Sequence, residues 1–255
     1  MRAFVISLSL LCACSASPTR IGFYQGNGTS HPGANDGFYE VLSVAAASAF
    51  GPGGFRISNA TGEDIAAITR ASHDIMVFPG GSGNGQATAV GEGGLSAMRD
   101  FVAAGGGYIG TCGGAFLGLQ HILFYGDGPA GHGPPTQEPF DRGHGNVSVE
   151  FTAGGRSALR LGDEFGGNVT IMYWQGPIVK PADMPANVSQ LAFFRTEIHS
   201  RHTNETAGEM VNTPAITTMD NYGSGRVVLN SPHPELLPQL PQIYAGELQW
   251  VLRMR

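Results

Sequence analysis

The segment from Asp74 to Ile122 constrains the fold most, because strand-like and helix-like stretches alternate there with glycine-rich turns between them. Asp74–Phe78 is an apolar run typical of a buried strand, and Pro79-Gly80-Gly81 ends it abruptly. The elements expected after it are a helix, a short strand and an apolar helix: Leu95–Ala104, Tyr108–Gly110 and a stretch ending near Ile122. Such alternation predicts an α/β fold with a parallel sheet and helices on both faces.

Further elements are expected on both sides of this unit. On the N-terminal side they are two strands and two helices, the second helix starting from a Thr61/Asp64 capping box: Arg20–Tyr24, Phe55–Ser58, Asp36–Phe50 and Ile65–Ala71. On the C-terminal side they are five strands and a closing helix: Val147–Phe151, Val169–Tyr173, Gln190–Phe194, Ala215–Met219, Gly225–Leu229 and Ile243–Leu252.

Between the two halves, Gly126–Gly145 is rich in Gly, Pro and His, and a loop of this length is expected to be either functional or disordered. No internal repeat and no linker marks a domain boundary. We therefore expect residues 17–255 to form a single domain.

The first sixteen residues have the pattern of a signal peptide. Met1-Arg2 is basic, the stretch to Cys14 is apolar, and small residues precede a cleavage site after Ala16. The apolar stretch is too short to span a membrane, and no later segment reaches the roughly 18 apolar residues that a spanning helix needs. A bacterial lipoprotein signal with Cys14 as the acylated residue is the alternative.

The glycosylation sequons favour a eukaryotic secretory or vacuolar/lysosomal route. Six of the 11 asparagines lie in Asn-x-Ser/Thr sequons. The alternative explanation is coincidence in a Thr- and Gly-rich chain. The predicted acceptors are Asn27, Asn59, Asn146, Asn168, Asn187 and Asn204. The formal charge of −6 argues against nucleic acid or an anionic membrane surface as a partner. A small-molecule or peptide-like substrate is expected instead.

Cys112 is the candidate nucleophile. It is the one cysteine left after the signal peptide, so no intramolecular disulfide is expected, and it lies in Gly110-Thr111-Cys112-Gly113-Gly114 between a strand and a helix. A sharp turn of this kind needs small neighbours and exposes the nucleophile at a helix N-terminus. The N–H groups of Gly113 and Gly81 are candidate oxyanion donors. The alternative is a small buried cysteine in a glycine-rich turn.

A base and its orienting partner are expected near the C-terminus. His233-Pro234-Glu235 follows the strand predicted over Gly225–Leu229, and a His-x-Glu pair on extended backbone brings imidazole and carboxylate side by side.

With these residues the sequence resembles the class I glutamine amidotransferases, and within that superfamily it is most similar to the biotin–protein ligase N-terminal-like domains. The shared features are Phe78-Pro79-Gly80-Gly81, the stretch from Phe101 to Gly110, the cysteine turn, Tyr173-Trp174-x-Gly176-Pro177 and His233-Pro234-Glu235. The resemblance covers nearly all of residues 17–255. It implies a flavodoxin-like doubly wound, mostly parallel sheet and a Cys112–His233–Glu235 triad, with His233 as base and Glu235 as its orienter.

One position departs from the family pattern. Glutamine-using members carry glutamine four residues after the nucleophile, where this chain has Phe116. Neither a synthase domain nor a ligase catalytic half is recognised in the sequence, so neither ammonia transfer nor biotin transfer is expected. The secreted γ-glutamyl hydrolases are a looser analogue in fold and compartment.

The sequence thus predicts a cysteine hydrolase acting on a small amide or γ-glutamyl C–N bond, without metal or organic cofactor. Phe116, Tyr173 and Trp174 are candidates for the substrate pocket, although the latter two are equally suited to fill the core. Asp141 and Arg142 are candidates for a substrate contact from the long loop.

Three other assignments compete with these. A catalytically silent ligand-binding or regulatory domain of the same fold is the main alternative, and a glycosylated structural protein is the second. A metal site is disfavoured because the candidate histidines lack ligand spacing and are expected at the surface: His132, His144, His199 and His202.

Overall fold

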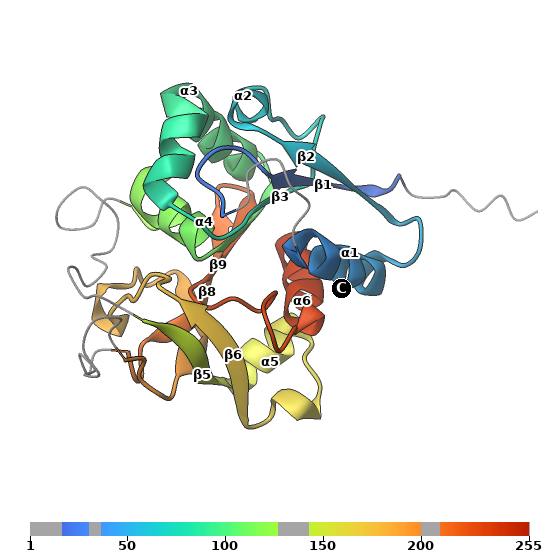
Figure 1. Ribbon diagram of the computed structural model, residues 1–255. Helices are drawn as coiled ribbons and strands as arrows, with labels where there is room; N and C mark the ends of the chain where they lie inside the picture. Colours follow the sequence, from blue (N-terminus) through green and yellow to red (C-terminus); the bar gives the residue numbers. More distant parts are fainter. Residues whose placement is uncertain (1–16, 31–36, 127–142, 200–209, 255) are drawn as a thin grey trace, which may run out of the picture.

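The computed structural model describes residues 17–30, 37–126, 143–199 and 210–254. These residues form one nine-stranded sheet in the order β2-β1-β3-β4-β9-β8-β7-β5-β6. Helices cover the sheet on both sides (Figure 1). The predicted α/β fold class is therefore confirmed.

One half of the sheet is parallel throughout. It consists of β2 (Phe55–Ala60), β1 (Thr19–Tyr24), β3 (Ile75–Phe78), β4 (Gly107–Thr111) and β9 (Gly225–Asn230). All four side chains of the central strand β3 are buried, as expected for a parallel strand covered on both faces.

The other half of the sheet is antiparallel. It adds β8 (Pro214–Tyr222), β7 (Val188–Phe194), β5 (His144–Phe151) and β6 (Asn168–Trp174) beyond β9. Because only β8 and β5 reverse, seven of the nine strands point the same way. Four of the eight neighbouring strand pairs are nevertheless antiparallel, so the sheet as a whole is mixed, and the predicted flavodoxin-like arrangement is found in its parallel half.

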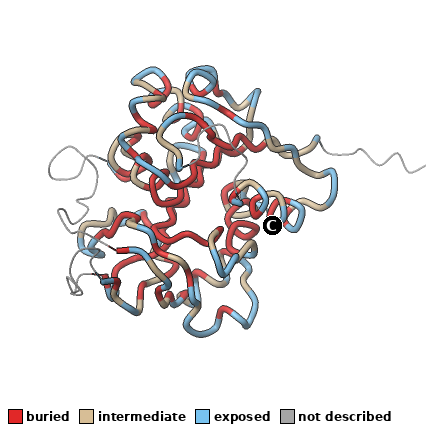
Figure 2. The backbone as a smooth tube through the Cα atoms, in the orientation of Figure 1, coloured by how far each residue is buried: buried red, intermediate tan, exposed pale blue. Residues whose placement is uncertain are grey.

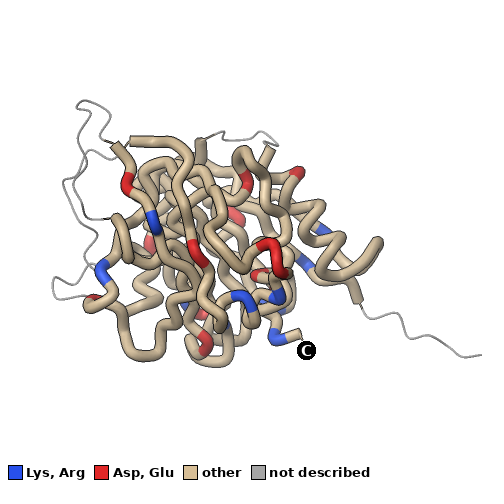
Figure 3. Tube along the Cα trace, turned by 90° about the horizontal axis from the view of Figure 1, so that it is seen from below, with Lys and Arg blue, Asp and Glu red and all other residues tan. Residues whose placement is uncertain are grey.

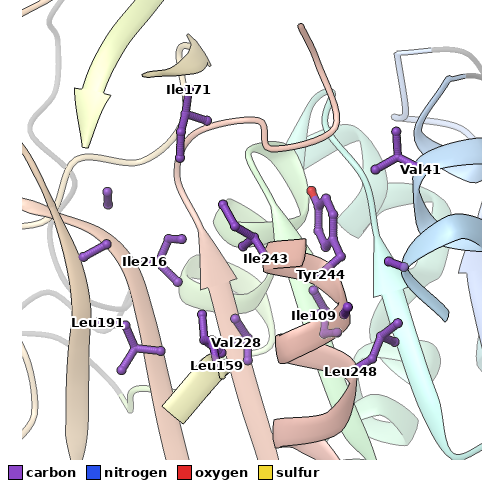
Figure 4. Packing of buried hydrophobic residues seen from close by; sticks show 14 of the residues in the cluster. Val41, Ile109, Leu159, Ile171, Leu191, Ile216, Val228, Ile243, Tyr244 and Leu248 are labelled. Atoms are coloured by element: carbon purple, nitrogen blue, oxygen red, sulfur yellow. The ribbon is translucent and has the colours of Figure 1, made fainter. Parts of the chain in front are cut away.

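Two apolar layers hold the helices on the sheet. On one face lie α1 (Gly37–Phe50), α5 (Ala153–Leu159) and α6 (Pro241–Val251), and Figure 4 shows Ile243, Tyr244 and Leu248 of α6 beside Ile109 and Val228 of the sheet. On the other face lie α2 (Gly62–Ile65), α3 (Gly83–Ala103) and α4 (Gly113–Phe116). The buried trace accordingly runs through the middle of the molecule (Figure 2).

Three local predictions were wrong. The helix expected over Ile65–Ala71 ends at Ile65, because Thr69 and Ser72 bond to each other in a turn while Arg20 donates to the carbonyl oxygens of Arg70 and Ala71. The glycine-rich stretch before Leu95 is helical from Gly83, with a break at Gly91. The helix α5 was not expected at all.

The signal peptide over 1–16 and most of the loop Gly126–Gly145 lie outside the described residues, as do His132, Asp141, Arg142, His202 and Asn204. Among the described residues, no helix has the length and apolar character needed to cross a membrane.

Acidic and basic positions are interspersed along the trace in Figure 3, without a large region of one sign.

Candidate functional site

The carboxyl ends of three adjacent parallel strands meet at one edge of the sheet, where ligands of α/β proteins commonly bind. Gly80 and Gly81 follow β3, Cys112 follows β4 and His233 follows β9. The fold thereby brings together residues that are far apart in the sequence.

Cys112 lies on a strained turn between β4 and α4. Its backbone φ of 51° and ψ of −103° are rare for a residue with a side chain, and strain of this kind is characteristic of a nucleophile on a sharp strand-to-helix turn. The Cys112 N–H donates to the Asn230 backbone oxygen at 2.8 Å, which ties the turn to the end of β9. The thiol is buried, and Sγ donates to the backbone oxygen of Trp174 at 3.3 Å.

A chain of buried hydrogen bonds leads away from His233. Its Nδ1 bonds to Glu235 Oε1 at 2.6 Å, and Glu235 Oε2 accepts from the Tyr244 hydroxyl at 2.8 Å. The Tyr244 hydroxyl also bonds to Thr111 Oγ1 at 2.9 Å, beside the cysteine turn. Both oxygens of Glu235 are thus engaged, so the carboxylate fixes the imidazole ring in one orientation.

The electrostatics of His233 favour the charged imidazolium. Burial lowers its pKa, but the carboxylate of Glu235 and the sulfur of Cys112 outweigh burial and raise the pKa of His233 well above its ordinary value. Nε2, the nitrogen not bonded to Glu235, is buried and has no hydrogen-bond partner within the described residues. This nitrogen is therefore the one that can exchange a proton with the thiol.

Gly80 lies against the side chains of both His233 and Cys112. A Cβ atom added there would lie 2.7 Å from His233 Cε1 and 3.6 Å from Cys112 Cβ. Only glycine fits between the two side chains without displacing the imidazole.

The two candidate oxyanion donors also lie together. A Cβ atom on Gly113 would lie 2.8 Å from the Gly81 nitrogen. Gly81 has a φ of 135° and faces Thr29 in an isolated antiparallel bridge, which holds its loop against the residues after β1. Within the described part of the chain, neither N–H is engaged in a backbone hydrogen bond.

The turn after β6 packs against the residues around His233. A Cβ atom on Gly176 would lie 1.9 Å from the Ser231 backbone oxygen, and Met172 forms a bridge with His233. Trp174, 48% exposed, stacks on His144 with 4.5 Å between the ring centroids. Tyr173 is instead fully buried in the core, with its hydroxyl on the Gly176 oxygen.

Phe116 lies on the helix that begins at the cysteine turn. It is half-buried, its N–H donates to the Cys112 backbone oxygen, and its Cβ lies against the start of α3 at Gly83. The position that carries glutamine in glutamine-using relatives therefore faces the beginning of α3.

A second buried carboxyl group interacts electrostatically with Glu235 and is not predicted from the sequence. Glu247 of α6 is completely buried, and its Oε2 accepts from Asn230 Nδ2 at 3.1 Å. The sequence signal for this buried acid is that Glu247 precedes Leu248 on the apolar face of the helix predicted from Ile243. Tyr244, on the same face, was missed in the same way.

The other predicted site residues are at the surface. His144 and His199 are exposed, as are the five sequon asparagines that fall within the described residues: Asn27, Asn59, Asn146, Asn168 and Asn187. In the ranges 17–30, 37–126, 143–199 and 210–254, no group of three or more His, Cys, Asp or Glu side chains is arranged to hold a metal ion.

This arrangement defines an α/β domain with a cysteine turn at the carboxyl edge of its sheet. Residues 23–131 match the family model described as the N-terminal region of biotin–protein ligase, which is about two fifths of the chain and confirms the predicted resemblance. The matched segment contains Gly81, Cys112 and Gly113 and ends before His233.

Comparison with solved structures shows the same fold in proteins of low sequence identity. A cytoplasmic protein from Salmonella typhimurium is 12% identical with a TM-score of 0.54, over 91% of this chain and 98% of that chain. A GH42 beta-galactosidase from G. stearothermophilus is 14% identical with a TM-score of 0.51, and the match covers 93% of this chain but 30% of that chain. A comparison with curated proteins gives no match.

Proposed function

We propose that this protein is a secreted cysteine hydrolase that cleaves a small amide or γ-glutamyl C–N bond through Cys112, His233 and Glu235. The observation that carries the proposal is the 2.6 Å bond between His233 Nδ1 and Glu235 Oε1, beside a cysteine on a strained turn. An oriented base next to a nucleophile is the requirement of covalent acyl-transfer catalysis.

The first half of the reaction forms a thioester. Cys112 passes its proton to His233 Nε2, and the thiolate attacks the carbonyl carbon of the substrate. The Gly81 and Gly113 N–H groups stabilise the oxyanion that develops, a contribution of about 3 to 4 kcal/mol per donor in comparable sites. His233 then gives its proton to the departing nitrogen, the C–N bond breaks and the amine leaves.

The second half returns the enzyme to its starting state. His233 removes a proton from a water molecule, which attacks the thioester carbon. The C–S bond breaks, the carboxylic acid leaves and the proton returns to sulfur. Glu235 stabilises the imidazolium in both halves, and Tyr244 keeps that carboxylate in place.

The second candidate function is ligand binding without turnover. It is favoured by the resting position of the thiol, which is buried and bonded to the Trp174 backbone oxygen. A site of this kind binds its ligand without forming a thioester.

The deciding experiment measures the alkylation rate of Cys112 by iodoacetamide between pH 5 and 9 in the wild type, in His233→Ala and in the control His73→Ala. His73 bonds to Ser58, away from Cys112. A hydrolase requires rapid alkylation below pH 7 that is lost in His233→Ala and kept in His73→Ala. Incubation with a γ-glutamyl anilide, followed by mass spectrometry of trapped Cys112, then tests acyl transfer. Slow alkylation in all three proteins, with ligand-dependent stabilisation only, would support the binding function instead.

Secretion and glycosylation are part of the proposal. They are supported by the exposure of the five sequon asparagines within the described residues, because an occupied acceptor must reach solvent. Expression of the full chain in eukaryotic cells should release a protein into the medium whose mass falls on endoglycosidase treatment. Retention in the cytosol at the unmodified mass would contradict this part.

A further inference from the structure

A carboxyl group that the proposed reaction does not use is buried directly behind the triad. Glu247 Oε2 accepts from Asn230 Nδ2, but the second oxygen of each side chain, Glu247 Oε1 and Asn230 Oδ1, has no partner among the described residues. Leaving two buried acceptors unsatisfied is costly. A proton on Oε1 removes the mismatch, because the O–H group is the donor that the Asn230 oxygen lacks.

Asn230 connects this acid to the nucleophile. Its backbone oxygen accepts the Cys112 N–H at 2.8 Å, and it pairs with Thr111 in the parallel register of β4 and β9. The strained turn therefore depends on the position of Asn230, and the side chain of Asn230 is held by Glu247.

The surroundings of Glu247 oppose its ionisation. Burial is the main cause that raises its pKa, to about 8; the bond from Asn230 lowers it, and the charge of Glu235 raises it further. Glu235, which lies in the turn after β9, and Tyr244, which lies on α6 itself, interact electrostatically with this region. Both belong to the hydrogen-bond chain of His233.

We propose that protonated Glu247 is a positioning residue, which clamps the Asn230 side chain and thereby holds the cysteine turn in its reactive geometry. When Glu247 ionises, the O–H donor disappears and a second buried negative charge develops near Glu235. The clamp then loosens, and the site loses reactivity on the alkaline side. The effect of Glu247 on reactivity rests on the proposed function of Cys112. The protonation of Glu247 can be tested independently of that function.

The first measurement is infrared difference spectroscopy of the full chain between pH 6.5 and 9.5. The wild type should lose the carbonyl band of one protonated carboxyl group with a midpoint near 8, and Glu247→Gln should lack this band. Glu92→Gln, the same change at an exposed position of α3, should retain it. A band absent from the wild type, or still present in Glu247→Gln, would overturn the proposal whatever the fate of the hydrolase function.

The second measurement is the iodoacetamide rate of Cys112 in Glu247→Gln and Glu247→Leu. Gln supplies an N–H donor and a carbonyl acceptor, so it should keep the rate at pH 7 and lack the alkaline decline expected of the wild type. Leu leaves the buried Asn230 side chain unpaired and should slow alkylation roughly tenfold at pH 7. Equal rates in all three proteins at every pH would refute the clamp. Slow alkylation in the wild type would count against the hydrolase function, whereas the protonation of Glu247 would still be decided by the infrared measurement.

Discussion

Replacing Glu247 by Gln should change how the stability of the fold depends on pH. The pKa of Glu247 rises from 4.5 in the unfolded chain to about 8 in the fold, mainly through burial. The folded state thus binds more protons than the unfolded state between these two values, and the free energy of unfolding must fall as pH rises through that window. The contribution is fully present below pH 4.5 and lost above about pH 8.

The size of the effect follows from the same shift. At 1.36 kcal/mol per pKa unit, ionisation of Glu247 removes about 4 to 5 kcal/mol of stability between pH 4.5 and 8. Gln has a similar shape, bonds to Asn230 and cannot ionise, so the variant avoids this loss. The difference in free energy of unfolding between Glu247→Gln and wild type should therefore grow in favour of the variant with rising pH and level off above pH 8.

The assay is urea unfolding followed by tryptophan fluorescence at pH values from 4.5 to 9, with free energies obtained by linear extrapolation. Comparing variant with wild type cancels the other titrating groups, and Glu92→Gln serves as the exposed control, whose curve should overlay that of the wild type. If the curves of Glu247→Gln and wild type stay parallel across the range, Glu247 is already ionised in the fold and the reasoning is refuted.

Two further predictions concern the thiol site and the edge of the sheet. Gly80→Ala should fold, but its Cys112 should be alkylated at least tenfold more slowly, because the new Cβ would lie 2.7 Å from His233 Cε1 and displace the imidazole. Gly37→Ala, where the space is open, is the control. An unchanged rate in Gly80→Ala would show that His233 is not needed in this position. Asp74→Asn should lower stability in urea unfolding at pH 7 by about 1 to 3 kcal/mol, because Arg20 donates to both carboxylate oxygens. Burial raises the pKa of Asp74, but the hydrogen bonds and charge of Arg20 lower it more. The stability contributed by the ion pair is therefore present above pH 3.8 and lost as pH falls below it. If Asp74→Asn loses as much stability at pH 3 as at pH 7, the ion pair is not the source of the loss.

Two parts of the candidate site are encoded by local patterns. A cysteine between glycines after a strand, and a histidine two residues before a glutamate, are short-range signals, and the fold brings both to adjacent strand ends. Their role in catalysis remains a prediction. The bond between Asn230 and Glu247 joins a strand to a helix, and no local pattern announces such a pairing.

The glycines at the start of α3 show why a helix was missed there. Glycine is a poor helix former, so the sequence predicts a glycine-rich turn rather than a helix before Leu95. In the structure, Gly83 contacts Phe116 Cβ and Gly85 contacts the Gly28 Cα so closely that larger residues would not fit. Close tertiary packing thus outweighs the low propensity of these residues, and single-chain patterns do not record that packing.

The pairing of β4 with β9 has a consequence for biosynthesis and for limited proteolysis. Cys112, the proposed nucleophile, is translated early, but His233, its proposed base, follows only after β9, whose register with β4 brings Asn230 beside Thr111. A nascent chain, or a fragment cut before Gly225, therefore carries Cys112 without His233 and Glu235. If the proposed function holds, the chain becomes reactive only when its second half has been made, and cleavage within that half should abolish the reactivity of Cys112.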